Sequence, residues 1–500
     1  FAAENASAVD DEMAIEESVL TIEEDGDALE VTGDVALEKT PADVVTNDTF
    51  FNYFDASGSL LSNVTADELE FDGDFSGINV STITINKAIK FKGKNATFNG
   101  VSLLINSSDV SVKGFTFIQN NSGYLIKVDQ VSNVALSNNF LGYQAIADED
   151  SYAILANAVK NLRLINNVIN YFGSTSGTKV NNAVRVSESE NVVFEYNEFL
   201  ISVPSVYVYW QEIPAGSGNW VSAPLSEGIV IMSTKGAKFI DNVVALEYEG
   251  VFGLSDTIYT MDFNDVDDAV IYDNDIEALG HSYVHGIIIS GDNFNITDNK
   301  ITVVSDVGYA NGIEVDGPAT GVIADNVIGA KGPESAYGIY SGMNGKDASV
   351  YYRSNVIEVG AYFAVGLSLG DLQSWIYSNN ITAVGNYTMG IASLAKYMLA
   401  AGNEIILNSS EQGNESVLDL FGCESNGVKV KNGYNLLYNN TIEAAGCAVK
   451  AIGGKLTLSG NVIDVVGNDD KEAYAIYAVD VSELLITRNN VSYVGKTKGN

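Results

Sequence analysis

Side chains suited to acid–base catalysis are scarce in this sequence. The candidate bases other than lysine are Arg163, Arg185, Arg353, Arg488, His281 and His285. Elimination chemistry on acidic sugars needs a strong base beside calcium-binding carboxylates, and glycoside hydrolysis needs paired carboxyl groups facing a cleft. The two histidines flank a turn and are interpreted as a sporadic exposed pair. Carboxylates are so numerous that adjacent pairs arise without selection for chemistry. We therefore predict no catalytic residues and no enzymatic activity.

Four aspartates are the candidate ligands for a metal ion. They are Asp262, Asp265, Asp267 and Asp268, in the segment DTIYTMDFNDVDDA. Oxygen ligands of this kind suit calcium, but the spacing is that of neither an EF-hand nor a nonapeptide calcium repeat. A solvated acidic loop is the alternative interpretation. We predict no cofactor, and calcium is the one ion that these residues suit.

The charge of the chain excludes some classes of partner. The 500 residues include 65 acidic and 26 basic side chains, which give a formal net charge of −39 at pH 7. This charge repels nucleic-acid phosphates and anionic lipid headgroups. No stretch approaches the roughly 18 uninterrupted apolar residues of a membrane-spanning helix. We predict no nucleic-acid partner and no membrane span in this chain.

A repeat organises most of the sequence. An asparagine followed immediately, or two residues later, by an aliphatic or aromatic residue recurs with an average spacing of about 29 residues. It recurs at Asn139, Asn167, Asn197, Asn242, Asn274, Asn299, Asn326, Asn355, Asn380, Asn403, Asn440, Asn461 and Asn490. A second marker, a small residue followed by an aliphatic strand, precedes most of these asparagines, as in HGIII at 285–289 and NGIEV at 311–315. Both markers keep phase, which indicates a succession of similar units.

Each unit reads as strands rather than helices. Apolar residues alternate with polar ones, β-branched and aromatic residues are frequent, and a unit has room for about three short strands. The predicted fold class is therefore all-β, a single right-handed parallel β-helix of about 14 coils with an N-terminal cap. Asparagine at a fixed corner tolerates the left-handed backbone conformation, and stacked side-chain amides can bond from coil to coil as a ladder.

The repeat also predicts the division of the chain. We expect an acidic N-terminal tail at 1–40, a cap at 41–70, and the β-helix at 71–500 with insertions near 202–226, 255–268 and 408–424. A cap is expected because an open coil exposes unpaired backbone and apolar core. Cys423 and Cys447 approach the same corner of successive coils, so a disulfide between them is one possibility.

Two sets of residues point to contacts outside the cell. The first insertion resembles a hairpin with a GSGN turn and carries the candidate binding residues Tyr207, Tyr209, Trp210 and Trp220. Exposed aromatic rings bind sugars or proteins, although the hairpin can also bury them against the flank of the helix. The candidate glycosylation sites are Asn5, Asn47, Asn63, Asn79, Asn95, Asn106, Asn120, Asn295, Asn386, Asn408, Asn414 and Asn439. Asn380 and Asn490 also begin such triplets but are expected to be shielded in the ladder.

Together these segments resemble the adhesin-like surface proteins of methanogenic archaea, which are built on a pectin-lyase-like right-handed β-helix. The more specific likeness lies in TNDTFFNYFDASGSLLSNVTADELEFDGDFSGI at 46–78, ITINKAIKFKGKNATFNG at 83–100 and SVKGFTF at 111–117. The repeats, such as LRLINNVI at 162–169, are common to many β-helices. The resemblance implies secretion, attachment to the cell envelope and contact with other cells or surfaces, and it transfers no catalytic residue.

The predicted function is that of a non-enzymatic, extracellular, adhesin-like structural protein at the cell surface. Its predicted partners are other cell surfaces, glycans or envelope components. A second copy joined end to end through the tail at 1–40 would make filaments or an envelope layer. The alternative is a polysaccharide-active β-helix enzyme, a lyase, hydrolase or epimerase.

Overall fold

The structure is a computed structural model. It describes residues 43–121, 123–146, 150–173, 180–203, 211–212, 220–221, 226–248, 257–341, 348–409, 426–445, 447–466 and 474–494. All described residues belong to one unit of the chain, Ala42–Asn500. The predicted tail at 1–40 and most of the predicted insertion at 408–424 lie outside the described residues.

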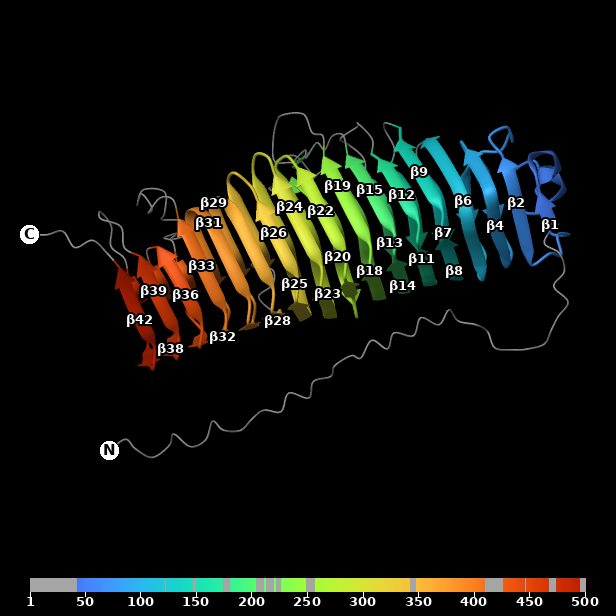
Figure 1. The fold of residues 1–500 in the computed structure, drawn as a ribbon. Coiled ribbons are helices and arrows are strands. Elements are labelled where there is room, and N and C mark those ends of the chain that lie inside the picture. The colour runs from blue at the N-terminus through green and yellow to red at the C-terminus, as the bar shows by residue number, and fades with distance from the viewer. Residues whose placement is uncertain are drawn as a thin grey trace, which may run out of the picture. The chain divides into compact units, whose positions relative to one another are not determined.

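Strands form because apolar and polar residues alternate within each unit. In Asp275–Gly280, for example, Ile276 and Ala278 are buried while Asp275 and Glu277 are exposed. Each strand pairs in parallel with the strand one unit earlier and the strand one unit later. Forty strands join in this way into one sheet that winds around a common core (Figure 1). The fold is a single right-handed parallel β-helix, so the predicted fold class is confirmed.

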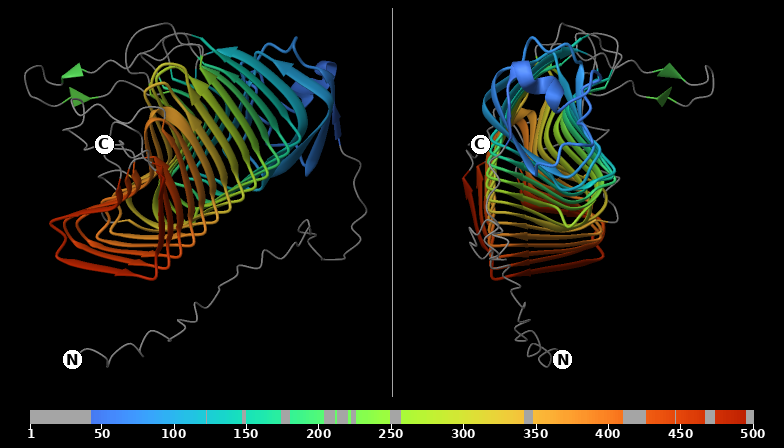
Figure 2. Two further views of the ribbon diagram at one scale, coloured as in Figure 1. Left: turned by 60° about the vertical axis from the view of Figure 1, so that its left-hand side comes forward. Right: turned by 90° about the vertical axis from the view of Figure 1, so that its right-hand side faces the viewer.

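Each coil has three sides, which we name A, B and C in chain order; Figure 2 shows the coils stacked one on the next. Side A is formed by β3 (Thr82–Ile85), β5 (Ser102–Ile105), β7 (Gly123–Asp129), β10 (Ser151–Asn157), β13 (Asn181–Ser187), β20 (Thr257–Asp267), β27 (Ser335–Ser341), β34 (Asn426–Lys431), β37 (Cys447–Ile452) and β40 (Tyr474–Val479). Side B is formed by β8 (Ser132–Ser137), β11 (Lys160–Ile165), β14 (Glu190–Glu195), β21 (Val270–Tyr272), β28 (Ser349–Arg353), β30 (Gln373–Tyr377), β32 (Tyr397–Ala401), β35 (Tyr434–Tyr438), β38 (Lys455–Ser459) and β41 (Glu483–Thr487).

Side C, which faces the viewer in Figure 1, follows the turn after side B. It is formed by β9 (Phe140–Ala145), β12 (Val168–Phe172), β15 (Glu198–Val203), β19 (Val243–Tyr248), β22 (Asp275–Gly280), β24 (Lys300–Ser305), β26 (Val327–Lys331), β33 (Glu404–Ser409), β36 (Thr441–Ala445), β39 (Val462–Val466) and β42 (Asn490–Val494). Longer strands span two sides: β2 (Glu68–Asp74), β4 (Ile89–Asn99) and β6 (Val110–Asn121) run from B to C, β18 (Ser226–Ile240), β23 (Tyr283–Thr297) and β25 (Tyr309–Ala324) from A to B, and β29 (Val356–Leu369) and β31 (Asn380–Ser393) from C into the next A.

The N-terminal end is closed by aromatic packing. β1 (Asp43–Val45) pairs with β2, and the short 3-10 helix η1 (Asn47–Asn52) follows it. Phe50 is fully buried and stacks on Phe54 at a centroid distance of 4.4 Å. Phe54 in turn packs against Phe71 and Phe91 of the first coils. These rings cover the apolar interior at this end, where an open coil would expose it.

An asparagine ladder occupies the turn between sides B and C. Asn326 shows the pattern: its backbone N–H donates to Oδ1 of Asn355 at 3.1 Å, and its Nδ2 donates to the same oxygen at 3.0 Å. The Nδ2 group also donates to the carbonyl of Ile296 in an earlier coil at 2.9 Å. The same bonds link Asn139, Asn167, Asn197, Asn242, Asn274, Asn299, Asn326, Asn355, Asn379, Asn403, Asn440, Asn461 and Asn489.

Two predicted ladder positions are wrong by one residue. Asn379 and Asn489 make the ladder bonds, whereas Asn380 and Asn490 begin the following C strands with exposed side chains. The predicted reason for asparagine also needs correction. The left-handed backbone conformation falls on the residue before each ladder asparagine, such as Ser378, whose φ is 53°. The asparagine is therefore selected for its amide bonds and not for its backbone.

Side A contains a sharp bend at one position of every coil. The paired strands skip this position, which is Leu125 in β7 and a small residue or threonine in the later coils: Ala153, Ala183, Gly228, Thr260, Gly286, Gly312, Gly338, Gly366, Gly390, Gly427, Ala448 and Ala475. A Cβ atom on Gly338 would lie 2.3 Å from Cγ2 of Ile357 and 2.7 Å from the carbonyl oxygen of Gly366. This close approach explains the second sequence marker, since the glycine of HGIII and NGIEV is the bend residue.

The structure changes the prediction for the insertions. Residues 257–267 form β20, which pairs with β18 and β23, so the predicted inserted loop at 255–268 is wrong for these residues. Within the first predicted insertion, β16 (Gln211–Glu212) and β17 (Trp220–Val221) pair in antiparallel fashion, as a hairpin requires. In the part of the chain that the structure describes, no helix is long and apolar enough to cross a membrane.

Candidate functional site

Exposed aromatic rings form a surface on side B of the later coils. We define this aromatic surface as Tyr351, Trp375, Tyr397, Leu399, Tyr434 and Leu436. The parallel register places Trp375 between Tyr351 and Leu399, and it places Tyr397 beside Tyr434. The side chains of Tyr397 and Tyr434 are 43% and 48% exposed.

The rings of the aromatic surface stack from coil to coil. Tyr351 and Trp375 lie 4.3 Å apart with an interplanar angle of 8°, and Tyr397 and Tyr434 lie 5.4 Å apart at 17°. The ammonium group of Lys455 lies 5.2 Å from the centroid of the Tyr434 ring. Flat rings, one of them with a cation over its face, can bind the apolar face of a sugar or an aliphatic side chain of a partner.

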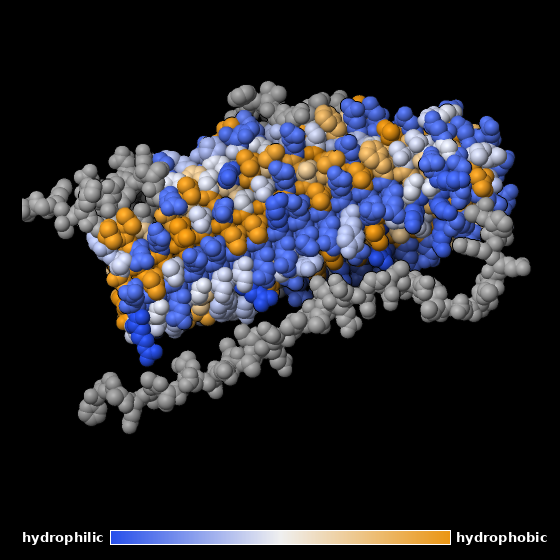
Figure 3. Space-filling view, viewed as in Figure 1, coloured by the Kyte–Doolittle hydropathy of each residue, from blue (hydrophilic) through white to orange (hydrophobic). Residues whose placement is uncertain are grey.

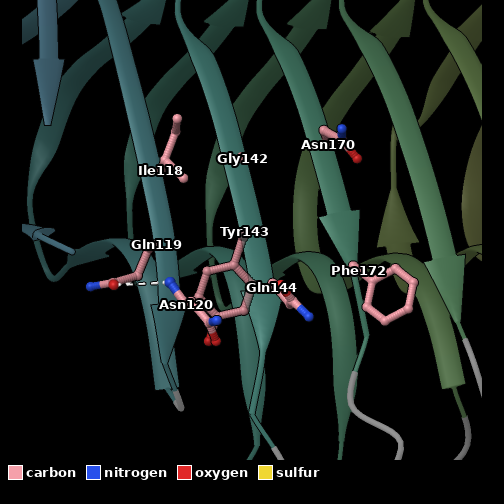
Figure 4. Close-up of a pocket in the computed structure, with 8 residues that line it drawn as sticks. All are labelled: Ile118, Gln119, Asn120, Gly142, Tyr143, Gln144, Asn170 and Phe172. Carbon is pink, nitrogen blue, oxygen red and sulfur yellow. Dashed lines mark hydrogen bonds between the residues drawn. The ribbon is translucent and has the colours of Figure 1, made fainter. Parts of the chain in front are cut away.

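A hollow of about 480 Å³ lies on side C at β6, β9 and β12 (Figure 4). Its lining is Ile118, Gln119, Asn120, Gly142, Tyr143, Gln144, Asn170 and Phe172. The register places Gly142 between Ile118 and Asn170, and the missing side chain leaves space there. None of these residues carries a charge, in a chain with a net charge of −39. Amides beside aromatic rings suit an uncharged ligand with hydroxyl groups.

Side C also presents apolar residues to solvent (Figure 3). Val243, Val327 and Val356 directly follow the ladder asparagines and are 48%, 52% and 40% exposed. Together with the aromatic surface, they give two sides of the helix an amphipathic exterior.

A buried polar cluster lies on the outer face of the side-A bend. His285 and Asn311 each precede the bend glycine of their coil and pair in register. Nδ1 of His285 lies 2.7 Å from Oε2 of Glu314 and 3.2 Å from Nδ2 of Asn311. The His285 ring meets the Tyr259 ring edge to face at a centroid distance of 4.9 Å. We define the bend cluster as Tyr259, His285, Asn311 and Glu314.

The bend cluster was not found by sequence reasoning. His285 is only 8% exposed, so its interpretation as an exposed residue is wrong. His281 is half-buried just before β23, and its carbonyl accepts a bond from Oγ of Ser305 at 3.0 Å. The available signal was the position of His285 directly before a bend glycine, because outward side chains there are enclosed by the bend.

The predicted binding residues of the hairpin are not located by the structure. Tyr207, Tyr209 and Trp210 lie outside the described residues, and the side chain of Trp220 is not described. The aromatic surface was missed although its residues recur at fixed distances before the ladder. Tyr351 and Trp375 stand four residues before Asn355 and Asn379, a period that the sequence already contains.

The four predicted metal ligands do not converge. Asp262 is buried within β20, while Asp265 accepts a bond from Oγ of Ser233 at 3.3 Å. Asp267 accepts the backbone N–H of Asp292, and Asp268 accepts Nδ2 of Asn293. Within the described ranges, no group of three or more His, Cys, Asp or Glu side chains has the arrangement of a metal site.

Most candidate glycosylation sites are exposed where the structure describes them. Asn47, Asn63, Asn79, Asn95, Asn106, Asn120, Asn408 and Asn439 are exposed, and Asn295 and Asn386 are half-buried. Asn5 and Asn414 lie outside the described residues. The expected shielding of Asn380 and Asn490 is wrong, since both are exposed beside the true ladder positions.

Of the two cysteines in the candidate disulfide, the structure describes only Cys447. Cys447 begins β37 and is buried, and its Sγ lies 3.3 Å from the carbonyl oxygen of Val449. Cys423 lies outside the described residues, so the pairing stays a prediction.

Comparison with known proteins yields similarity to β-helix structures. No family model matches the chain, and no curated protein matches it. The A-module of mannuronan C-5 epimerase AlgE6 from Azotobacter vinelandii is 10% identical in sequence and superposes with a TM-score of 0.33. The match covers 90% of this chain and 96% of the module. The adhesin PfbA of Streptococcus pneumoniae is 10% identical, with 90% and 95% coverage and a TM-score of 0.24. Both an enzyme and an adhesin are therefore among the similar structures, and the similarity does not distinguish the two functions.

Proposed function

We propose that this protein is a non-enzymatic, extracellular, adhesin-like surface protein that makes contact with other surfaces or glycans. The observation that carries this proposal is the aromatic surface on side B, where stacked rings that are exposed, or half-buried in the case of Trp375, follow one another over successive coils. Exposed apolar area of this kind on a folded protein is typical of an interaction site.

The rest of the β-helix supports a role as a rigid carrier. The ladder bonds and the apolar core continue from coil to coil, so the surface is held at a fixed geometry. The uncharged hollow around Gly142 adds a second place suited to a neutral glycan. Exposed glycosylation triplets in the first coils agree with an extracellular location.

The test compares two surface variants in binding to glycan-coated and cell-coated supports. The first variant replaces Tyr351, Trp375, Tyr397 and Tyr434 with serine, and the second replaces Val243, Val327 and Val356 of side C with serine. We expect the aromatic variant to lose at least tenfold in binding and the side-C variant to lose less than threefold. Equal binding by the aromatic variant and the unchanged protein would reject the aromatic surface as the contact site.

Self-assembly through the tail at 1–40 is part of the same proposal. Deletion of residues 1–40 should abolish filaments or layers seen by electron microscopy, and it should leave glycan binding by the aromatic surface unchanged. Assemblies that persist after the deletion would remove the tail from the assembly mechanism.

The alternative of a polysaccharide-active enzyme is favoured by one observation. His285 lies against the carboxylate of Glu314, an arrangement that orients an imidazole as a general base. Incubation with acidic and neutral glycans, with and without calcium, tests it. New reducing or unsaturated ends would support the enzyme, and unchanged glycans support the non-enzymatic function.

A further inference from the structure

The bend cluster differs from the rest of the outer surface because its polar groups are buried. On a straight strand, residues three positions apart point to opposite faces. Here Asn311 and Glu314 lie on either side of Gly312 and approach each other, with 3.4 Å between Nδ2 and Oε2. Both side chains therefore point outward across the bend, and the bend encloses them. Asn311, like His285, is 8% exposed.

The contact with Glu314 indicates the tautomer of the neutral His285 ring. A carboxylate only accepts hydrogen bonds, so at 2.7 Å the proton between His285 and Glu314 belongs to Nδ1 of the imidazole. In the neutral ring, Nε2 then carries the lone pair and acts as an acceptor. Glu314 is also the acceptor for the amide nitrogen of Asn311.

One atom of the cluster is left without a partner. Oδ1 of Asn311 is buried and has no hydrogen-bond partner among the described residues. A buried polar atom in this state makes folding less favourable. The cluster thus presents two acceptors, Nε2 of His285 and Oδ1 of Asn311, and a ligand that satisfies them must donate hydrogen bonds.

The surroundings restrict the charge of that ligand. The titratable side chains at outward positions of the neighbouring coils are Tyr259, Asp262, Glu314, Asp316, Tyr337 and Tyr340. Three of these side chains, Asp262, Glu314 and Asp316, are acidic. Burial, and after it the negative charges of Glu314 and Asp316, raise the pKa of Tyr340. Anionic ligands are therefore repelled, while the rings of Tyr337 and Tyr340, 5.3 Å apart, offer an apolar face.

We propose that the bend cluster is a binding site for an uncharged saccharide, whose hydroxyl groups donate to Oδ1 of Asn311 and Nε2 of His285. The bound sugar replaces the missing partner of the buried amide, and the tyrosine rings pack against its C–H face. The site lies on side A, separate from the aromatic surface on side B, and binding there requires no turnover.

The experiment measures binding of three named probes to the full chain by calorimetry. Cellotetraose and N-acetylchitotetraose are uncharged, and tetragalacturonate is the anionic probe. We expect at least one uncharged probe to bind and tetragalacturonate to bind at least tenfold more weakly. Binding of neither uncharged probe, or stronger binding of the anionic one, would overturn the proposal.

Variants assign the binding to the cluster. Asn311→Leu removes the orphan acceptor and should reduce the affinity at least tenfold while leaving the melting temperature equal or higher. Thr260→Val is the matched control, because Oγ1 of Thr260 is also buried without a partner among the described residues but lies at the bend position itself. It should leave the affinity unchanged. Unaltered affinity in Asn311→Leu would contradict the assignment.

A spectroscopic readout separates this site from the other surfaces. The chain has 2 histidines, so their ring signals are readily resolved by NMR. The uncharged probe should shift the ring nitrogens of His285 and leave those of His281 in place. Trp375→Ser and Gly142→Val, which alter the aromatic surface and the side-C hollow, should retain this shift. Loss of the shift in either variant would place the sugar elsewhere.

Discussion

Outward-facing side chains are buried at the bend of side A and exposed on the aromatic surface of side B. On side A, the polar residues His285 and Asn311 point outward and are buried. On side B, the aromatic residues Tyr397 and Tyr434 point outward and are exposed. Inward and outward side chains alternate in the strands of both sides, so the difference comes from the backbone. The bend of side A encloses the outward side chains beside it, whereas the outward rings of Tyr397 and Tyr434 on side B stay exposed.

The bend encloses apolar residues in later coils as well. Val365 and Met389 precede Gly366 and Gly390 and form a small cluster that is separate from the main core. The same position is therefore polar at His285 and Asn311, apolar at Val365 and Met389, and polar again at Asn426. Outward side chains directly before the bend are buried whether they are polar or apolar, as His285, Asn311, Val365 and Met389 show.

The largest expected effect follows from adding a side chain at the bend. Gly338→Ala places a Cβ atom 2.3 Å from Ile357 and 2.7 Å from a backbone oxygen, so the coils must separate or the bend must open. We expect a loss of about 4 kcal/mol in the free energy of unfolding, measured with urea. Gly329→Ala on side C is the control, since its nearest atom lies at 3.9 Å. Equal stability of the two variants would show that the bend does not need glycine.

The next effect compares two adjacent asparagines at the turn between sides B and C. Asn379→Ala removes the ladder bonds to Asn355, Asn403 and the carbonyl of Tyr352 and leaves buried groups unpaired. We expect a loss of about 3 kcal/mol. Asn380→Ala removes an exposed side chain and should change stability by less than about 0.5 kcal/mol. Thermal unfolding of both variants decides whether the ladder position is correctly assigned.

A buried carboxyl group beside side A makes stability depend on pH. Asp371 is 1% exposed, and burial raises its pKa from 3.8 to about 6 despite hydrogen bonds from Tyr352 and Ser374 at 2.8 Å each. The folded state thus holds the proton more tightly than the unfolded state. The contribution of Asp371 to stability is greatest below pH 3.8 and is lost as the pH rises to about 6.

Asp371→Asn isolates this contribution. Between pH 3.5 and pH 7.5, the stability of the variant relative to the unchanged protein should rise by about 3 kcal/mol. Urea unfolding at both pH values measures the difference, and mutation of the exposed Asp275 to Asn serves as the control. A pH-independent difference would mean that Asp371 is ionised in the folded protein at both values.

The smallest effect on stability is expected on the aromatic surface. Trp375→Ser removes a half-buried ring whose main contact is Tyr351, so we expect a loss of at most about 1 kcal/mol. Its effect should appear in binding to glycan-coated supports. A loss of stability as large as that of Gly338→Ala would show that the surface is structural, and the contrast with side A would then disappear.

Much of the fold can be read from local pattern. The phase of the asparagines, the alternation of apolar residues and the recurring glycine marker predict parallel coils, because each depends only on neighbours in the chain. The same pattern misplaced Asn380 and Asn490, since adjacent asparagines at 379–380 and 489–490 fit the marker equally well. Only the bonds to neighbouring coils distinguish them.

The candidate sites depend on contacts that local pattern does not contain. His285 and Glu314 stand in successive coils, and their 2.7 Å contact requires both the coil register and the bend at Gly312. The aromatic surface likewise exists because the register aligns Tyr351 with Trp375 and Tyr397 with Tyr434. Composition and periodicity establish that this chain winds into a β-helix. Which outward side chains meet, and whether water reaches them, follows from the stacking and curvature of the coils.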